Sequence, residues 1–224
     1  GVLLILISFV SKAQDNSPYS RYGLGDIVPN TNILNRGMGG ISAGLTDFQS
    51  VNFTNPASYA AFNTISQAKS KERIYSRVLL DIGIDYNNRS LSEPNKTEKF
   101  ASNNLVFSYL QMGIQMRKNW GMSFGLRQLT RENYRQVKLE RLFDPNTNLP
   151  IDSAITEYAG SGGAFLPNIG TGFAIKNLSI GVNMGYIFGK KEISTKRALI
   201  NDTVDYNSGN ITSTTSFNKL FFNA

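Results

Sequence analysis

Few residues of this chain have the types and spacing that catalysis or metal binding requires. The 224 residues include no cysteine and no histidine, which removes thiol nucleophiles, disulfides, the usual zinc ligands and the commonest general base. The stretch Gly37-Met38-Gly39-Gly40 follows no predicted strand and lacks the Lys-Ser/Thr of a phosphate-binding loop. Asp144–Asn148 begins like a calcium loop, but Leu149 replaces its glycine and Ile155 its final glutamate. The sequence predicts no enzyme, no cofactor and no metal site.

The remaining candidates are four charged residues within predicted strands, namely Asp81, Asp85, Arg117 and Arg127. Each lies at a position that alternates with apolar residues, so we expect all four on the polar face of a sheet. There they can pair with one another or with a segment that packs on that face. A role in ligand binding is the weaker alternative, because the expected ligand is apolar.

A strict alternation predicts the strands that carry these residues. Leu178–Gly189 reads LSIGVNMGYIFG, with apolar residues at every even position and mostly glycine, serine or asparagine at the odd ones. Side chains this small and polar cannot build a soluble core, so we interpret one face as facing lipid and the other as facing a barrel lumen. The same alternation, with Val106 among the outward residues, predicts strands at 73–87, 104–117, 120–129 and 169–175, and a sixth from about 212.

The connections between these strands alternate in length. Lys118-Asn119 and Lys176-Asn177 predict tight hairpins. Long polar loops are expected at 88–102, 141–158 and 199–211. This alternation is typical of outer-membrane barrels. The aromatic residues expected at the membrane interfaces are Trp120, Tyr86, Tyr109 and Tyr186.

The two ends of the chain and its charge complete this interpretation. The apolar run of residues 1–10, followed by Ser11-Lys12-Ala13, predicts a partial signal peptide over residues 1–13 and hence export. Six strands cannot close a barrel, and open edges are not tolerated in lipid, so the final strand is interpreted as truncated. The net charge of +7 is scattered along the chain, which argues against a nucleic-acid partner.

Two segments resemble a known family. The glycine-rich stretch with Gly37, Gly39 and Gly40, followed by Asn55, Pro56 and Ala57, resembles the hatch of the FadL/TodX-type outer-membrane transporters of hydrophobic compounds. Phe165–Pro167 with the strand that follows is similar to that family's central strands.

The resemblance implies an all-β transmembrane antiparallel barrel, fourteen-stranded when complete, with an N-terminal hatch inside it. Residues 14–70 would then be the hatch, and residues 71–224 the first part of the barrel. The implied location is the outer membrane of a gram-negative bacterium.

Two functions follow from this interpretation. The first is passive uptake of hydrophobic small molecules such as long-chain fatty acids, with outer-membrane lipid and the ligand as partners. Leu142, Phe143, Leu149 and Ile151 would begin its ligand pocket in an outer loop. The alternative is a non-conducting FadL-like barrel that serves as a scaffold or shuttle subunit of a larger envelope or secretion complex, with other outer-membrane proteins as partners.

Overall fold

The computed structural model describes residues 17–62, 78–92, 97, 99–143, 145–148, 150–200 and 207–224. The predicted signal peptide (1–13) and the start of the first expected strand (73–77) lie outside these residues. The strands are β1 (Asp26–Ile27), β2 (Val78–Ser92), β3 (Lys99–Arg117), β4 (Trp120–Phe143), β5 (Pro150–Ile175), β6 (Leu178–Ile200) and β7 (Gly209–Asn223).

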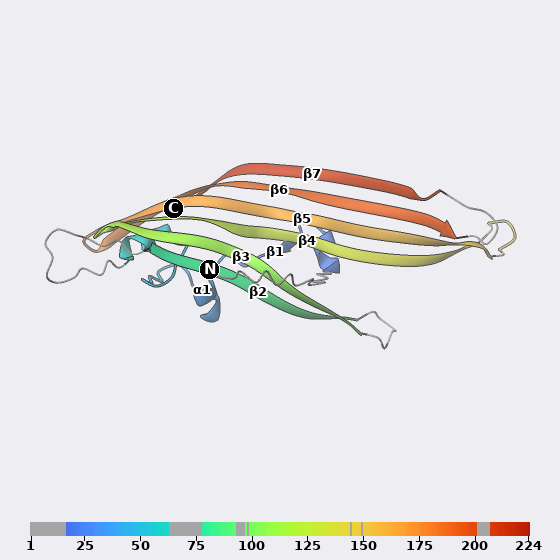
Figure 1. Ribbon diagram of the computed structural model, residues 1–224, viewed down its shortest axis with the longest axis horizontal. Coiled ribbons are helices and arrows are strands. Elements are labelled where there is room, and N and C mark those ends of the chain that lie inside the picture. The colour runs from blue at the N-terminus through green and yellow to red at the C-terminus, as the bar shows by residue number, and fades with distance from the viewer. Residues whose placement is uncertain are drawn as a thin grey trace, which may run out of the picture.

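One antiparallel sheet contains all of these strands (Figure 1). Its order is β2-β3-β4-β5-β6-β7, so each of these strands pairs with its neighbour in the chain, and β1 pairs with β4. The prediction of an antiparallel all-β fold is therefore confirmed. Within the described residues the sheet is open, with β2 and β7 as its edge strands.

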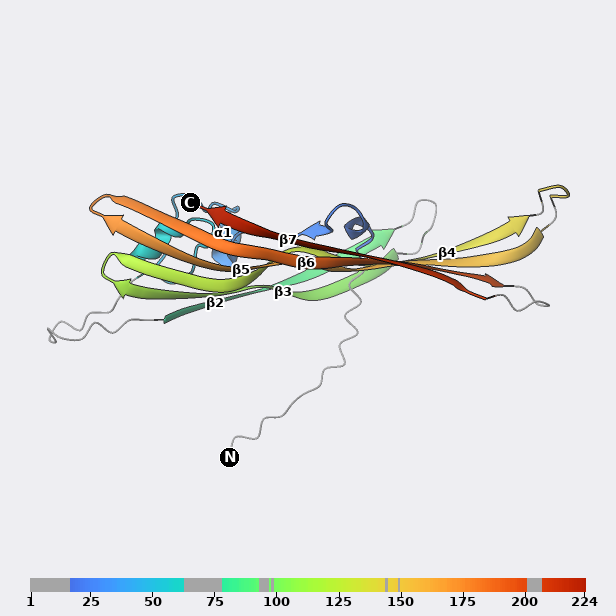
Figure 2. The same ribbon diagram turned by 90° about the horizontal axis from the view of Figure 1, so that it is seen from above.

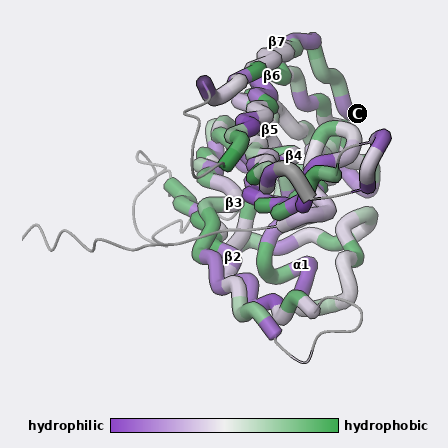
Figure 3. Tube along the Cα trace, turned by 90° about the vertical axis from the view of Figure 1, so that its right-hand side faces the viewer, coloured by the Kyte–Doolittle hydropathy of each residue, from purple (hydrophilic) through white to green (hydrophobic). Residues whose placement is uncertain are grey.

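The sheet is curved, and a mostly irregular N-terminal segment lies on its concave face. Viewed end-on, the strands follow an arc from β7 to β2, with α1 (Ile33–Gly37) on the inside (Figure 3). Two 3-10 helices, η1 (Pro18–Arg21) and η2 (Pro56–Ala61), complete the regular structure of this segment. None of the helices in the described part of the chain has the length and apolar character needed to cross a membrane.

Alternation along the strands separates two faces, which we call the outer and the inner face. On β2 and β6 the apolar residues are exposed on the outer face, as in Ile82, Ile84, Ile180 and Val182. On β3 the expected alternation is wrong at one point. The register shifts where Gly83 pairs with Tyr109 but Ile84 with Phe107.

Because of the extra residue at this β-bulge, residues 105–107 alternate between the two faces in the opposite sense to the prediction. Leu105 and Phe107 are therefore exposed on the outer face, and Val106 lies on the inner one. Tyr109, expected at a membrane interface, is instead only 1% exposed on the inner face. Tyr86 and Tyr186 are exposed on the outer face, and their position at a membrane interface stays a prediction.

The two tight hairpins are confirmed. β6 ends and β7 begins within the expected loop at 199–211, of which residues 201–206 lie outside the described residues. The other two long loops are predicted too long. β2 and β3 continue through most of the expected loop at 88–102, and the register of β4 and β5 continues to the pair Leu142 and Asp152. In Figure 2, β4 and β5 extend well past the ends of β2 and β3. Polar residues can form these extensions, because the main-chain hydrogen bonds between paired strands do not require apolar side chains.

These extensions can be tested by amide hydrogen exchange. Amides of residues 153–158, which β4 and β6 pair on both sides, should exchange slowly, as should those amides of residues 133–141 that face β5. Residues 145–148, in the connecting turn, should exchange fast and serve as the control within the same experiment. Equally fast exchange in all three stretches would restore the loop interpretation.

Candidate functional site

The N-terminal segment (residues 17–62) packs on the inner face of the sheet. Val51, Tyr59 and Phe62 from this segment form an apolar cluster with Leu79 of β2. The Phe53 ring meets the edge of the Tyr109 ring, with 5.0 Å between centroids. Phe53, Val51 and Tyr59 are at most 1% exposed. The small-residue face of the sheet is thus covered by protein.

A row of glycines makes this close contact possible. Gly121 of β4 pairs with Gly172 of β5, which pairs with Gly181 of β6, so the three lie side by side across the sheet. A Cβ atom at Gly121 would overlap the main chain of Tyr59, and one at Gly172 or Gly181 the main chain of Pro56. The backbone of η2 therefore rests directly on the backbone of three strands.

The next row of the sheet holds η2 through hydrogen bonds. The Tyr59 hydroxyl donates to Asn183 Oδ1 at 3.0 Å, and Asn183 Nδ2 donates to the Phe53 carbonyl at 2.9 Å. Burial raises the pKa of Tyr59 to about 12, against the lowering effect of the hydrogen bond with Asn183. Tyr59 therefore stays protonated over the physiological range and remains a donor.

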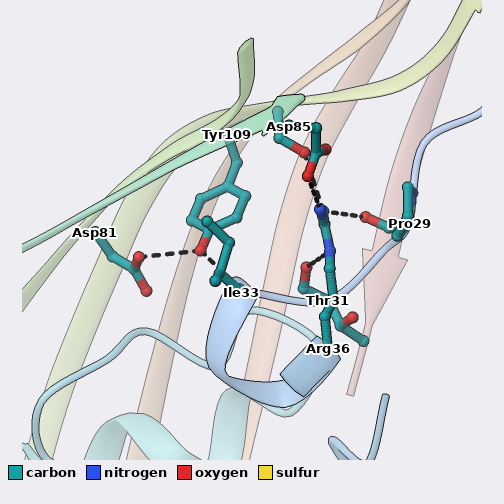
Figure 4. Close-up of polar contacts among 8 residues, drawn as sticks. Pro29, Thr31, Ile33, Arg36, Asp81, Asp85 and Tyr109 are labelled. Atoms are coloured by element: carbon teal, nitrogen blue, oxygen red, sulfur yellow. Dashed lines mark hydrogen bonds and ion pairs between the residues drawn. The ribbon is translucent and has the colours of Figure 1, made fainter. Parts of the chain in front are cut away.

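Asp81 and Tyr109 bind main-chain groups of the N-terminal segment. The Tyr109 hydroxyl donates to Asp81 at 3.0 Å and accepts from the amide of Ile33 at 2.9 Å (Figure 4). The other Asp81 oxygen accepts from the Val51 amide at 3.1 Å. Side chains of β2 and β3 thereby accept hydrogen bonds from the first amide of α1, at Ile33, and from the amide of Val51.

Arg36 of α1 is the most extensively bonded charged side chain at this contact. It donates to Asp85 of β2 at 2.6 Å and to Ser108 of β3 at 2.9 Å. It also donates to the carbonyls of Thr31 and Pro29, both at 2.9 Å (Figure 4). One guanidinium thus joins α1, the chain that leads into it and two strands.

One further ion pair and one lysine connect the N-terminal segment to the strands nearer the extended ends. Arg89 of β2 contacts Asp26 of β1 at 3.0 Å. Lys191 of β6 contacts the buried Glu132 of β4 at 3.0 Å, and its ammonium also donates to the Arg21 and Gly23 carbonyls.

The predicted charged residues therefore lie in different surroundings. Asp81 and Asp85 contact the N-terminal segment directly. Arg127 is 3% exposed, donates to Asn30 at 2.5 Å and lies 5.0 Å from the Phe53 ring centroid. Arg117 ends β3 at the hairpin and is exposed. The structure brings the first three to one contact and leaves Arg117 outside it.

The two motifs of the expected hatch also differ. Asn55 precedes η2, and Pro56 and Ala57 begin it, directly above the glycine row. Gly37, Gly39 and Gly40 lie at the end of α1, where Gly39 and Gly40 have φ near +80° and no atom would oppose a Cβ. The Asn55-Pro56-Ala57 motif therefore contacts the glycine row, whereas the glycine-rich stretch forms an open turn.

The first two residues of the expected ligand loop lie in a strand. Leu142 and Phe143 belong to β4 and pair with Asp152 and Pro150 of β5. Leu149 lies outside the described residues. Ile151 belongs to β5.

Sequence reasoning missed Arg36, Tyr59 and Asn183. Arg36 is a cation within the glycine-rich stretch, and the expected inner-face carboxylates Asp81 and Asp85 needed a cationic partner. That match of charge could have indicated Arg36. Tyr59 and Asn183 are 124 positions apart, and no sequence signal joins them. In the described residues no three potential metal-ligating side chains come together. The arrangement holds a segment in place, and we assign it no reaction.

The comparisons with known proteins give one match. A family model described as BamG matches residues 1–224. No curated protein and no solved structure matches this chain.

Adding one methyl group to the glycine row should loosen the N-terminal segment. Gly121→Ala should destabilise the protein by ~1–3 kcal/mol, because the new Cβ would overlap the Tyr59 main chain. Gly37→Ala, where nothing lies within 4 Å of the added Cβ, is the matched control. Limited proteolysis of residues 17–62 and denaturant titration measure the effect. Equal cleavage rates for both variants would contradict the close contact.

The Arg36–Asp85 pair should show coupling in a double-mutant cycle. Arg36→Met alone should destabilise by ~1–3 kcal/mol, because it removes charged hydrogen bonds and leaves the half-buried Asp85 without its cation. Asp85→Leu in the Arg36→Met background should cost less than Asp85→Leu alone. Strictly additive free energies of unfolding would mean that the pair does not hold the segment.

Proposed function

The chain belongs to the BamG family, and from this premise we propose that it is a subunit of an outer-membrane assembly related to the BAM complex. In this role it is a non-catalytic scaffold in the outer membrane of a Gram-negative bacterium. Its partners are other outer-membrane proteins. The observation that carries the proposal is the match of the BamG model over the whole chain.

This premise corrects two expectations from the sequence. The assignment to the FadL/TodX transporters is wrong, because the matching family is BamG. The uptake of hydrophobic small molecules falls with it. The motifs behind that assignment were short, and Asn55-Pro56-Ala57 is explained by the beginning of η2 on the glycine row.

The chemistry of the outer face supports a membrane location. Exposed apolar side chains line the outer face of β2 and of β6, including Leu80, Ile82, Ile180, Val182 and Met184. An apolar band facing lipid is the pattern of outer-membrane barrels. Unpaired main-chain groups are costly in lipid, so we propose that further strands pair with the outer edges of β2 and β7 to close a barrel.

The N-terminal segment then lies inside that barrel as a fixed plug. Support comes from its ties to the inner face, where Arg36, Asp81, Arg89 and Lys191 each bond across the contact. We place the plug within residues 14–70 and the barrel wall within 71–224, with residues 1–13 as a signal peptide. A wall filled by a bonded segment suits a scaffold better than an open channel.

The scaffold role predicts a stable assembly. Native mass spectrometry of the tagged protein, extracted gently from its outer membrane, should give a stoichiometric complex with other outer-membrane proteins. Val182→Arg, on the exposed outer face, should cost ~2–4 kcal/mol if this strand is near the bilayer midplane. It should therefore lower the amount of assembled complex. Lys196→Glu, an exposed charge change on the polar extension of β6, is the control. A protein recovered alone under all extraction conditions would overturn the proposal.

A further inference from the structure

β3 and β4 separate part of the way along the sheet. They pair only from Tyr109–Arg127 to Arg117–Trp120. Beyond Tyr109, β3 remains paired with β2, while β4 continues with β5. Figure 1 shows β2 and β3 diverging from β4 toward their far ends. The N-terminal segment occupies the β4 edge at this point, through β1 and through the Ser17 amide, which donates to Asn133 at 2.9 Å.

Two stretches of main chain are left as free edges by this divergence. In the part of the chain that the structure describes, no strand pairs with the β4-facing edge of β3 over residues 103–107. The same is true of the β3-facing edge of β4 over residues 136–139. A free strand edge is a template for pairing with another chain.

Two cavities lie between the diverging strands. One, of about 370 Å³, is lined by Asp85 and Val106 on one side and by β1 and Arg131 on the other. The second, of about 670 Å³, lies between Phe100 and Val137. We call the space formed by these two cavities and the two free edges the β3–β4 groove.

The groove carries an excess of positive charge. Its cationic lining residues on the inner side are Arg21, Arg36, Arg89 and Lys138, and Arg131 lines it from an outer-face position of β4. Asp26 and Asp85 are its acidic ones and pair with Arg89 and Arg36, and Glu140 of β4 pairs with Lys138. By contrast, the outer-face side chains beside the two free edges are apolar and exposed, namely Leu105, Phe107, Val137 and Leu139. The inner side of the groove thus favours carboxylates and the outer side favours apolar groups.

The groove lies where the apolar band ends, so it can be reached from water. On β6 the outer face changes from Phe188 to Lys190. Register places Lys190 beside Gly163 of β5 and Gly163 beside Arg131 of β4. Arg131 lies at the beginning of the groove, so most of the groove is beyond the band.

We propose that the β3–β4 groove binds an extended segment of another polypeptide, which adds as a strand to the free edge of β3. Its carboxylate side chains point to the inner, cationic side and alternate with apolar side chains on the outer side. Main-chain hydrogen bonds provide affinity and the alternate side chains provide specificity. This inference names a partner-binding surface for the proposed scaffold and therefore rests on that function.

A peptide-binding experiment tests the charge and the strand pairing. The probe is a fluorescein-labelled peptide of about ten residues that alternates valine and glutamate, long enough to cover the free edge of β3 with flanking residues on both sides. Anisotropy with the full protein in detergent should show saturable binding. Replacing the glutamates by lysine, or two central residues by proline, should weaken binding at least about tenfold. Equal binding of all three peptides would indicate a non-specific amphiphile site and overturn the proposal, as would no binding.

A charge-reversed variant provides the complementary arm. Arg21→Glu with Lys138→Glu, both exposed at the groove, should weaken the glutamate peptide by about tenfold and favour the lysine peptide. Lys196→Glu, exposed on β6 away from the groove, is the control and should change neither. Equal effects of the two variants would mean that net charge alone governs binding.

Disulfide trapping locates the peptide, because the chain has no cysteine of its own. Leu105→Cys at the groove and Leu178→Cys at the opposite hairpin are matched, since both leucines are 65% exposed. A peptide with one central cysteine should crosslink to the first and not the second. Equal crosslinking would overturn the groove as the site. An intact assembly that fails these peptide tests removes the groove and leaves the scaffold function standing.

Discussion

The close approach of two backbones across the glycine row is the constraint on which the rest of the structure depends. Gly121, Gly172 and Gly181 come from three strands and meet only because the register aligns them. Their missing side chains let η2 rest on the sheet, and this contact places Tyr59 beside Asn183. Once η2 is held, the chain before it runs along the inner face, where Arg36 reaches Asp85. Small side chains on the inner face are thus a docking surface for a segment of the same chain.

Alternation in the sequence predicted the six long strands, both tight hairpins and the polar character of the inner face. It could not predict register, because register depends on which residues of distant strands pair. The β-bulge next to Tyr109 shows the consequence, since one extra residue turned Leu105 and Phe107 to the outer face and Val106 to the inner one. The predicted loops at 88–102 and 141–158 are too long, because a polar sequence does not exclude a strand. In the extensions of β4 and β5, paired main chains satisfy one another whatever their side chains.

The candidate site was predictable in part for the same reason. Asp81, Asp85 and Arg127 follow from alternation, but their partners Val51, Arg36 and Asn30 lie in a segment without periodicity. Short motifs were the weakest signal: Asn55-Pro56-Ala57 marked a real contact and still pointed to the wrong family. Fold does not determine function. The BamG assignment, together with a bonded inner face and an apolar outer face, favours a wall that supports partners over one that conducts.

A distance measurement between the N-terminal segment and the sheet tests the central claim most directly. Because the chain lacks cysteine, spin labels can be attached to cysteines replacing Ile41 of the segment and Ile180 of β6, both exposed. Pulsed electron–electron double resonance on the full protein in its assembly should give one narrow distribution of distances between the two labels, and Gly121→Ala should broaden it. A broad distribution in the unsubstituted protein would show that the segment is not held on the inner face, and would contradict the account.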